Sequence, residues 1–331
     1  SPATGRYPAP RMGASNYMTF EELKLAFMNP DADVNLKIQV LASYFEITEA
    51  YPELKNQALT LCEKLIEVSP DDSRAHALYG DFLFRDERFK EARTQYEQAL
   101  EGDKSRYSVW NQLLLCLNEL GETQKLNELS SEASDLFPQQ AVFFLYKGLS
   151  FMQLKQYEQA VEALREGSLI GTDNKALAVQ FLASLGDSYH HLARYSESDQ
   201  AYEEALLSDS NNIYVLNNYA YYLSIRKTRL DRAELLARRC NTLAPGRPSY
   251  EDTYAWVLFQ AGKKQEALKW IDRAIASGGN TNSTIWEHQG DIRWSLNQKD
   301  GAMESWKKAL ELGADKNRLE TKIREGLPEG Q

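Results

Sequence analysis

An internal pattern that recurs about every 34 residues is the feature that most constrains this chain of 331 residues. In each copy a small residue is followed twelve residues later by a second small residue, sixteen later by a large one and nineteen later by another small one. The five clearest copies begin at Gly80, Gly148, Gly186, Ala255 and Gly290. Because one copy is too short to enclose a core of its own, consecutive copies must stack to bury their apolar side chains.

Three weaker copies fill the gaps in this pattern. They begin at Glu46, Leu114 and Ala220, and the last has one extra residue in the turn at 226–229. Pro70, Pro138 and Pro245 stand where the second segment of a copy must stop, because proline lacks the backbone donor that a continuing helix requires. The eight copies, between about Gln39 and Lys316, therefore predict an all-α fold in which each copy is a hairpin of two helices.

The spacing of these residues resembles the tetratricopeptide repeat family, whose pattern is W-x2-L-G-x2-Y…A-x3-F…P. The resemblance implies a right-handed superhelical solenoid of about eight helix-turn-helix repeats, with a hollow face that binds protein or peptide partners. Residues 217–223, 252–258 and 288–294 further resemble consecutive terminal units of large bacterial members, many of which are exported to the cell envelope. That resemblance implies a periplasmic or outer-membrane-associated protein, with a cytoplasmic location as the alternative.

The ends and one junction of the array differ from the repeats. Residues 1–18 are proline-rich and read as a flexible linker or tag remnant, and 19–38 as an N-terminal capping helix. Residues 39–316 form the repeat array, expected as one continuous stack, and 317–331 a C-terminal capping helix and tail. The fourth copy runs about four residues long through 169–174, which predicts a bent or looped junction with the fifth.

Charge and hydropathy limit the classes of partner. Lysine and arginine number 38 against 48 acidic residues, so the formal net charge is −10. General binding of nucleic acid or of anionic membranes needs a cationic surface, and we expect neither. No apolar run approaches the roughly 18 residues of a membrane span, so membrane association is expected only through a partner or a lipid anchor outside this chain. Because the chain starts at Ser1, an upstream signal peptide, lipid anchor or catalytic domain stays open.

The sequence contains no familiar catalytic or phosphate-binding motif and only four histidines, so we expect no enzymatic activity, cofactor or bound metal. Asp187, His190 and His191 have the i, i+3, i+4 spacing that a transition metal could use. Adjacent residues of a helix diverge by about 100°, however, which leaves too few ligands on one side. A solvated face or a partner contact is the preferred interpretation.

The hollow-facing side of the first helices offers the best candidate site. Large aromatics beside short amides suit an extended peptide, because rings cover its side chains and asparagine bonds its backbone. The candidate groove residues are Asp187, His190, Tyr214, Asn217, Tyr221, Asp252, Trp256 and Phe259. The alternative is that Tyr221, Trp256 and Phe259 pack between hairpins as part of the core.

Gly-Asp pairs recur at 80–81, 186–187 and 290–291, which indicates a feature of the scaffold more than a designed site. If these acids face a partner, they favour one with basic side chains. The carboxylate clamp of chaperone-binding family members needs lysine and arginine where this chain has Asn217, Asn218 and Asp252, so an acidic chaperone tail is disfavoured.

Basic residues gather in one place. Residues 213–247 carry seven basic and two acidic side chains. The expected outer basic patch consists of Arg226, Lys227, Arg229, Arg232, Arg238 and Arg239. It fits either an anionic partner or lipid headgroups, or a solvated face paired with neighbouring acids, which is the favoured reading.

The sequence thus predicts a non-enzymatic protein–protein interaction adaptor that binds its partner in the concave groove, within a bacterial cell-envelope assembly. Two alternatives stay open. One is a regulatory or substrate-recruiting lobe of a larger enzyme. The other is a cytoplasmic co-chaperone-like adaptor.

Overall fold

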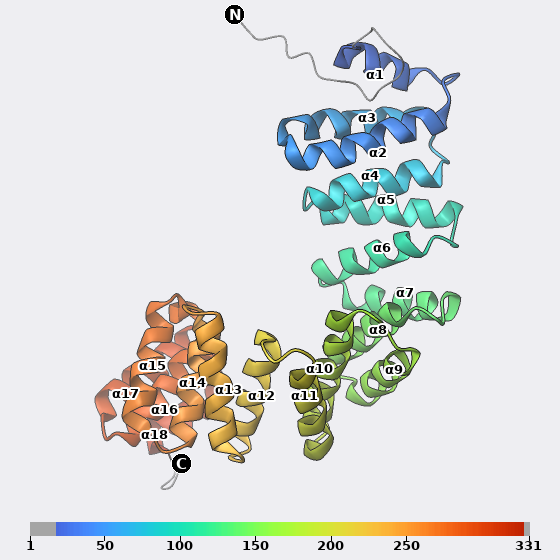
Figure 1. The fold of residues 1–331 in the computed structure, drawn as a ribbon. Helices are drawn as coiled ribbons and strands as arrows, with labels where there is room; N and C mark the ends of the chain where they lie inside the picture. Colours follow the sequence, from blue (N-terminus) through green and yellow to red (C-terminus); the bar gives the residue numbers. More distant parts are fainter. Residues whose placement is uncertain (1–17, 328–331) are drawn as a thin grey trace, which may run out of the picture. The chain divides into compact units, whose positions relative to one another are not determined.

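A computed structural model describes residues 18–327, so the predicted linker at 1–18 lies, apart from residue 18, outside the described residues. Within that range the regular structure is entirely helical, which confirms the all-α repeat fold (Figure 1). Eight helical hairpins follow one another along the chain, as the eight copies of the pattern predict.

The bounds of the helices follow the repeat. In the first four hairpins the pairs are α2 (Val34–Ala50) with α3 (Lys55–Val68), α4 (Ser73–Arg85) with α5 (Phe89–Gly102), α6 (Tyr107–Glu119) with α7 (Thr123–Leu136), and α8 (Ala141–Gln153) with α9 (Tyr157–Ile170). In the last four they are α10 (Lys175–His191) with α11 (Tyr195–Ser208), α12 (Ile213–Ile225) with α13 (Leu230–Leu243), α14 (Pro248–Gln260) with α15 (Lys264–Ala276), and α16 (Ser283–Ser295) with α17 (Lys299–Glu311). The flanking helices are α1 (Phe20–Met28) and α18 (Lys316–Glu325).

The chain divides into two compact units, 1–170 and 171–331, where a single continuous stack was expected. The division falls in the long fourth copy. Helix α9 ends at Ile170, and Gly171 has a positive φ of 79°, a conformation that glycine adopts without strain. The Asn174 side chain then accepts hydrogen bonds from the first backbone amides of α10, which starts the next hairpin.

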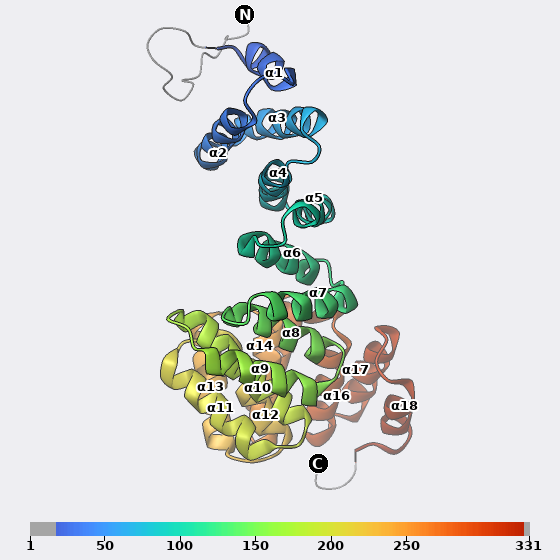
Figure 2. The same cartoon turned by 90° about the vertical axis from the view of Figure 1, so that its right-hand side faces the viewer.

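Within each unit the hairpins form two layers. The first helices touch the first helices of the next hairpin, as in α2·α4 and α4·α6 of the first unit and α12·α14 and α14·α16 of the second. Each second helix packs against its own first helix and against the first helix of the next hairpin, as α5 does between α4 and α6 (Figure 2). The first helices therefore share one side of each unit, which we call the first-helix face.

The turns inside the hairpins are short and regular. Three residues usually join the two helices, and one of them has a positive φ, as at Glu87, Lys155 and Ala193. The turn after α12 has four residues, and two of them, Lys227 and Arg229, have a positive φ. The extra residue predicted at 226–229 is thus absorbed by a second left-handed residue.

The small residues of the pattern lie where the two helices of a hairpin meet. A Cβ added to Gly80 would lie 2.6 Å from the Tyr96 ring, and one added to Gly186 would lie 2.8 Å from the Tyr202 ring. Gly290 faces Trp306 in the same way. Tyr96, Tyr202 and Trp306 are wholly buried, so the glycine leaves the space that the ring fills.

Gly186→Ala should destabilise the protein although alanine is the better helix former. The new methyl group would overlap the Tyr202 ring, and overpacking of this kind costs about 1–3 kcal/mol. The matched control is Gly301→Ala on α17, where the nearest atoms, 3.3 Å away, belong to the flexible Arg293 side chain. Thermal unfolding followed by circular dichroism should show a clear loss only for Gly186→Ala. Equal melting of both variants would show that the close contact is unimportant.

Candidate partner-binding face

All eight candidate groove residues lie on the first helices of the second unit. Asp187 and His190 come from α10, Tyr214, Asn217 and Tyr221 from α12, and Asp252, Trp256 and Phe259 from α14. Consecutive first helices are in contact with each other in this unit. The structure therefore places the candidates on the helices of one first-helix face. They differ in how far their side chains are already engaged by contacts inside the unit.

The Asp187 carboxylate is hydrogen-bonded to other side chains of the same unit. The residue is buried, and its carboxylate accepts hydrogen bonds from the hydroxyls of Tyr202 and Tyr214 and a longer one, 3.4 Å, from Asn218 Nδ2. The other two Gly-Asp pairs repeat the arrangement. Tyr96 donates to Asp81 at 2.8 Å and Trp306 Nε1 to Asp291 at 2.9 Å. These contacts favour the scaffold interpretation of the recurring acid.

His190 is held by aromatic neighbours. Its ring stacks on Tyr222 with centroids 3.7 Å apart and is tilted against Tyr195 at 5.5 Å. Burial, with help from the positive charges of Arg226 and His191, lowers the pKa of His190 to about 4. The imidazole is therefore neutral near pH 7, and its Nδ1 is buried with no hydrogen-bond partner among the described residues.

Asp252 and Trp256 both contact His288, a buried residue of α16 that the candidate set does not include. His288 Nδ1 lies 2.8 Å from Asp252 Oδ1, and the Trp256 ring stacks on the imidazole at 4.0 Å. Burial by itself lowers the pKa of His288, but the carboxylates of Asp252, Asp291 and Glu287 outweigh it, so the pKa is raised. Phe259, 7% exposed, packs beside Trp256 in the core.

Four further candidates keep exposed surface or polar groups that the unit does not use. The Tyr214 side chain is 51% exposed and Tyr221 is half-buried. Among the described residues, Asn217 Oδ1 and Trp256 Nε1 are buried without hydrogen-bond partners. Such atoms carry a cost of about 1–3 kcal/mol that a bound donor or acceptor removes. These side chains lie on α12 and α14, the middle of the face.

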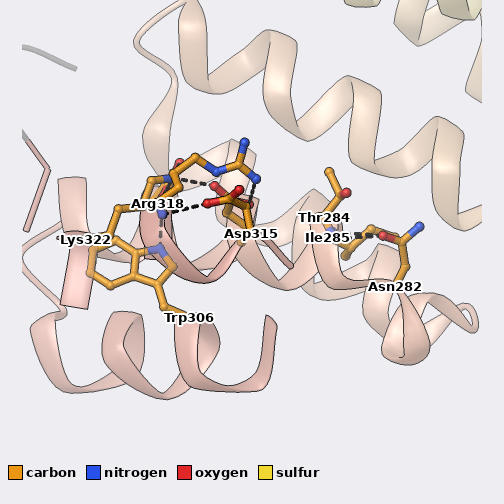
Figure 3. A network of polar contacts seen from close by, with 9 residues as sticks. Asn282, Thr284, Ile285, Trp306, Asp315, Arg318 and Lys322 are labelled. Atoms are coloured by element: carbon orange, nitrogen blue, oxygen red, sulfur yellow. Dashed lines mark hydrogen bonds and ion pairs between the residues drawn. The ribbon is translucent and has the colours of Figure 1, made fainter. Parts of the chain in front are cut away.

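Helix α18 adds charges to the same unit (Figure 3). Lys322 Nζ lies 2.8 Å from Glu287 Oε1 and 2.7 Å from Asp291 Oδ2, and Arg318 Nη2 lies 2.6 Å from Glu287 Oε2. Burial raises the pKa of Asp291, although Lys322 and the bond from Trp306 oppose this. The C-terminal helix is thus fixed to α16 by a nearly buried ammonium group held between two carboxylates.

Sequence reasoning missed Glu287, His288, Arg318 and Lys322 as parts of this face. One signal was present: Glu287 and Asp291 are four residues apart on one helix, and Arg318 and Lys322 are four apart on another. Residues with that spacing share a helix side, so the two pairs could have been matched by charge.

The expected outer basic patch is largely paired within the second unit. Arg226 binds Asp199 at 2.5 Å, while Arg229 and Arg232 both bind Glu203, at 2.9 and 2.7 Å. Arg238 lies 3.7 Å from Glu234, and Arg239 donates to Asn211 at 2.6 Å. This pairing supports the reading of the patch as a solvated face over that of an anion-binding surface.

Within residues 18–327, no three histidine, cysteine, aspartate or glutamate side chains gather closely enough to hold a metal ion. In the same range, no helix combines the length and the apolar composition needed to cross a membrane.

The pKa values of His288 and His190 should be shifted in opposite directions. In NMR titrations of the histidine ring signals, His288 should have a midpoint above its ordinary pKa of about 6.5, and His190 a midpoint near 4. Because the folded-state pKa of His288 is raised, its pairing with Asp252 stabilises the fold most below about pH 6.5 and is lost as pH rises through the folded pKa. Asp252→Asn should therefore lower the unfolding temperature more at pH 6 than at pH 9. An equal loss at both values would contradict the pairing.

Lys322→Met should lower the free energy of unfolding by about 3–5 kcal/mol, because Asp291 would be left buried without an ion pair and Glu287 would keep only Arg318. Arg318→Met is the matched control, since that side chain is 59% exposed and its ion pair contributes about 1 kcal/mol or less. Thermal and urea unfolding of the two variants measure the difference. Similar losses would show that α18 is not fixed by Lys322.

Comparison with known proteins agrees with this geometry. Tetratricopeptide repeat family models match residues 55–121 and 179–212. The chain is 29% identical over 150 residues to the type IV pilus assembly protein PilF of Pseudomonas aeruginosa, a match that covers 44% of this chain and 56% of PilF. The chain therefore spans little more than half the length of that relative.

Solved structures give the same fold. A tetratricopeptide repeat protein from Parabacteroides merdae is 15% identical with a TM-score of 0.60, over 76% of this chain and 97% of that one. The Cut9–Hcn1 hetero-tetramer of the APC/C is 16% identical with a TM-score of 0.56, over 92% of this chain and 62% of that one. With the repeat spacing, the eight hairpins and the family models in agreement, the chain is a member of the tetratricopeptide repeat family.

Proposed function

We propose that this protein is a non-enzymatic scaffold that binds a protein or peptide partner across the first-helix face of its second unit, within a bacterial cell-envelope assembly. The observation that carries the proposal is the contrast within that face. Asp187 and Phe259 are used by the unit itself, whereas His190, Asn217, Tyr221 and Trp256 retain a partly exposed ring or an unpaired polar atom.

An extended main chain has the groups that these side chains need. A backbone N–H can donate to Asn217 Oδ1, and a backbone C=O can accept from Trp256 Nε1, after small rotations that expose the two atoms. The Tyr214 and Tyr221 rings lie on the same helix, where they can cover the partner's apolar side chains. A partner that satisfies both polar atoms removes a desolvation cost present in the free protein.

The charges around Tyr221 favour a partner with at least one basic side chain. Burial raises the pKa of Tyr221, and the negative charges of Asp252 and Glu287 add to the effect while Arg318 opposes it. Two acids and one exposed arginine thus lie near this ring. The Arg318 side chain is 59% exposed, so it can move aside for a ligand cation that binds Glu287.

The place in an envelope assembly is supported by the relative. PilF of Pseudomonas aeruginosa is named as a type IV pilus assembly protein, and it is similar to part of this chain. The resemblance of residues 217–223, 252–258 and 288–294 to exported bacterial members points the same way. A periplasmic or outer-membrane-associated site of action belongs to this proposal.

Replacing Tyr221 and Asn217 together by alanine should reduce partner capture by about tenfold or more, because a ring contact and a hydrogen bond are lost. The measurement is quantitative mass spectrometry of proteins retained from a bacterial envelope extract by the immobilised chain. Tyr51→Ala is the matched control, since Tyr51 is 54% exposed and lies in the first unit. Its captured proteins should equal those of the unchanged chain.

Helical circular dichroism and the melting temperature should stay close to those of the unchanged chain in all variants. The same captured proteins from the double variant and the unchanged chain would refute the assignment of this face. A large loss of stability in the double variant would show that Tyr221 belongs to the core.

A further inference from the structure

A recess of about 320 Å³ opens on the first-helix face of the first unit, and its charged lining is incompletely paired. It lies among helices α2, α4 and α6. Ile38, Leu78 and Val109 supply an aliphatic wall, and Arg74, Asp81 and Arg106 supply charge. Its volume exceeds that of one water molecule, about 30 Å³, by a wide margin, so a side chain can enter it.

Arg106, the residue that precedes α6, is the unusual member of this lining. Its Nη1 is buried and has no hydrogen-bond partner among the described residues. A guanidinium carries five donors in a fixed fork, and burying one of them unpaired is costly. The other arginines nearby are engaged: Arg74 by Asp72 and Asn35, and Arg85 by the Phe45 carbonyl and Thr48.

Asp81 lines the same recess, and only one of its two carboxylate oxygens accepts a hydrogen bond. Its Oδ1 accepts the hydrogen bond of the Tyr96 hydroxyl at 2.8 Å. Burial raises the pKa of Asp81, although the bond from Tyr96 and the charges of Arg106 and Arg85 oppose this. Within residues 18–327 its Oδ2 has no hydrogen-bond donor, so one acceptor is available beside the donors of Arg106.

Arg106 and Asp81 attract each other, yet no ion pair joins them in the part of the chain that the structure describes. The recess therefore has an acceptor in its lining, and a small rotation of the Arg106 side chain can turn the unpaired donor toward it. A carboxylate ligand would be attracted by Arg106 and repelled by Asp81, and an ammonium ligand the reverse. A carboxamide matches both, because its C=O accepts from Arg106 while its NH2 donates to Asp81.

We propose that this recess binds the side-chain carboxamide of a glutamine or asparagine presented by a partner polypeptide. The amide end lies between Arg106 and Asp81, and the methylene stem packs on Ile38, Leu78 and Val109. This binding site goes beyond the proposed function of the second unit and does not depend on it, since none of its residues belongs to that face.

Three small probes test the proposal on the full chain: acetyl-leucyl-glutamine N-methylamide and the matching glutamate and methionine compounds. All three share the same main chain, so they differ only in the side-chain end. Binding is followed by NMR through the backbone amide signals of residues 107–112. The glutamine probe should bind about tenfold more tightly than the other two, as expected for a pair of buried hydrogen bonds.

Two variants and a control locate the effect. Arg106→Gln should abolish the preference for glutamine. Asp81→Asn keeps an oxygen for the Tyr96 hydroxyl but turns the free acceptor into a donor, so the preference should invert toward the glutamate probe. Arg165→Gln, an exposed site on α9, should leave all affinities unchanged.

Equal binding of the three probes would show that only the main chain is recognised, and it would overturn the proposal. Glutamine preference that survives Arg106→Gln, or the lack of any saturable shift, would overturn it as well. Because the measurement concerns the first unit alone, its failure would leave the partner-capture result for Tyr221 and Asn217 unaffected.

Discussion

The contact between a glycine on the first helix and a buried ring on the second is the constraint on which three of the eight hairpins depend. At Gly80, Gly186 and Gly290 there is no room for a methyl group, because the rings of Tyr96, Tyr202 and Trp306 occupy the space. The aspartate after each glycine then accepts a hydrogen bond from the polar atom of that ring. One aromatic side chain thus fixes both the separation and the rotation of its two helices.

This fixed rotation decides which side chains a partner can reach. On α10 the aspartate after the glycine, Asp187, is held by the hydroxyls of Tyr202 and Tyr214, so it is not free for a partner. On α12 and α14 the residue after the small one is Tyr221 or Trp256 instead, and both side chains are only partly buried. The stability of the scaffold and the composition of the candidate face therefore have the same origin, and a recurring acid can be conspicuous in sequence without being available for binding.

The repeat spacing was sufficient to predict the all-α fold, the eight hairpins and the extra residue at 226–229, because each depends on residues close in sequence. The candidate site was predicted less completely. The contact of His288 with Asp252 joins residues 36 positions apart, and that of Lys322 with Asp291 joins residues 31 apart. Both depend on which hairpins lie side by side and on side-chain direction, which periodicity does not specify. The recess at Arg106 was missed for a similar reason, since only the packed structure shows that Arg74 and Arg85 are engaged and Arg106 is not.

Photo-crosslinking from the two sides of the second unit tests most directly whether partners bind the first-helix face. A benzoylphenylalanine in place of Tyr221 on α12 samples that face, and one in place of Leu235, 51% exposed on α13, samples a second helix. Partner binding on the first-helix face predicts that irradiation in a bacterial envelope extract joins the partner to position 221 and not to position 235. Crosslinks from position 235 alone would contradict it, because they would place the partner on the second helices.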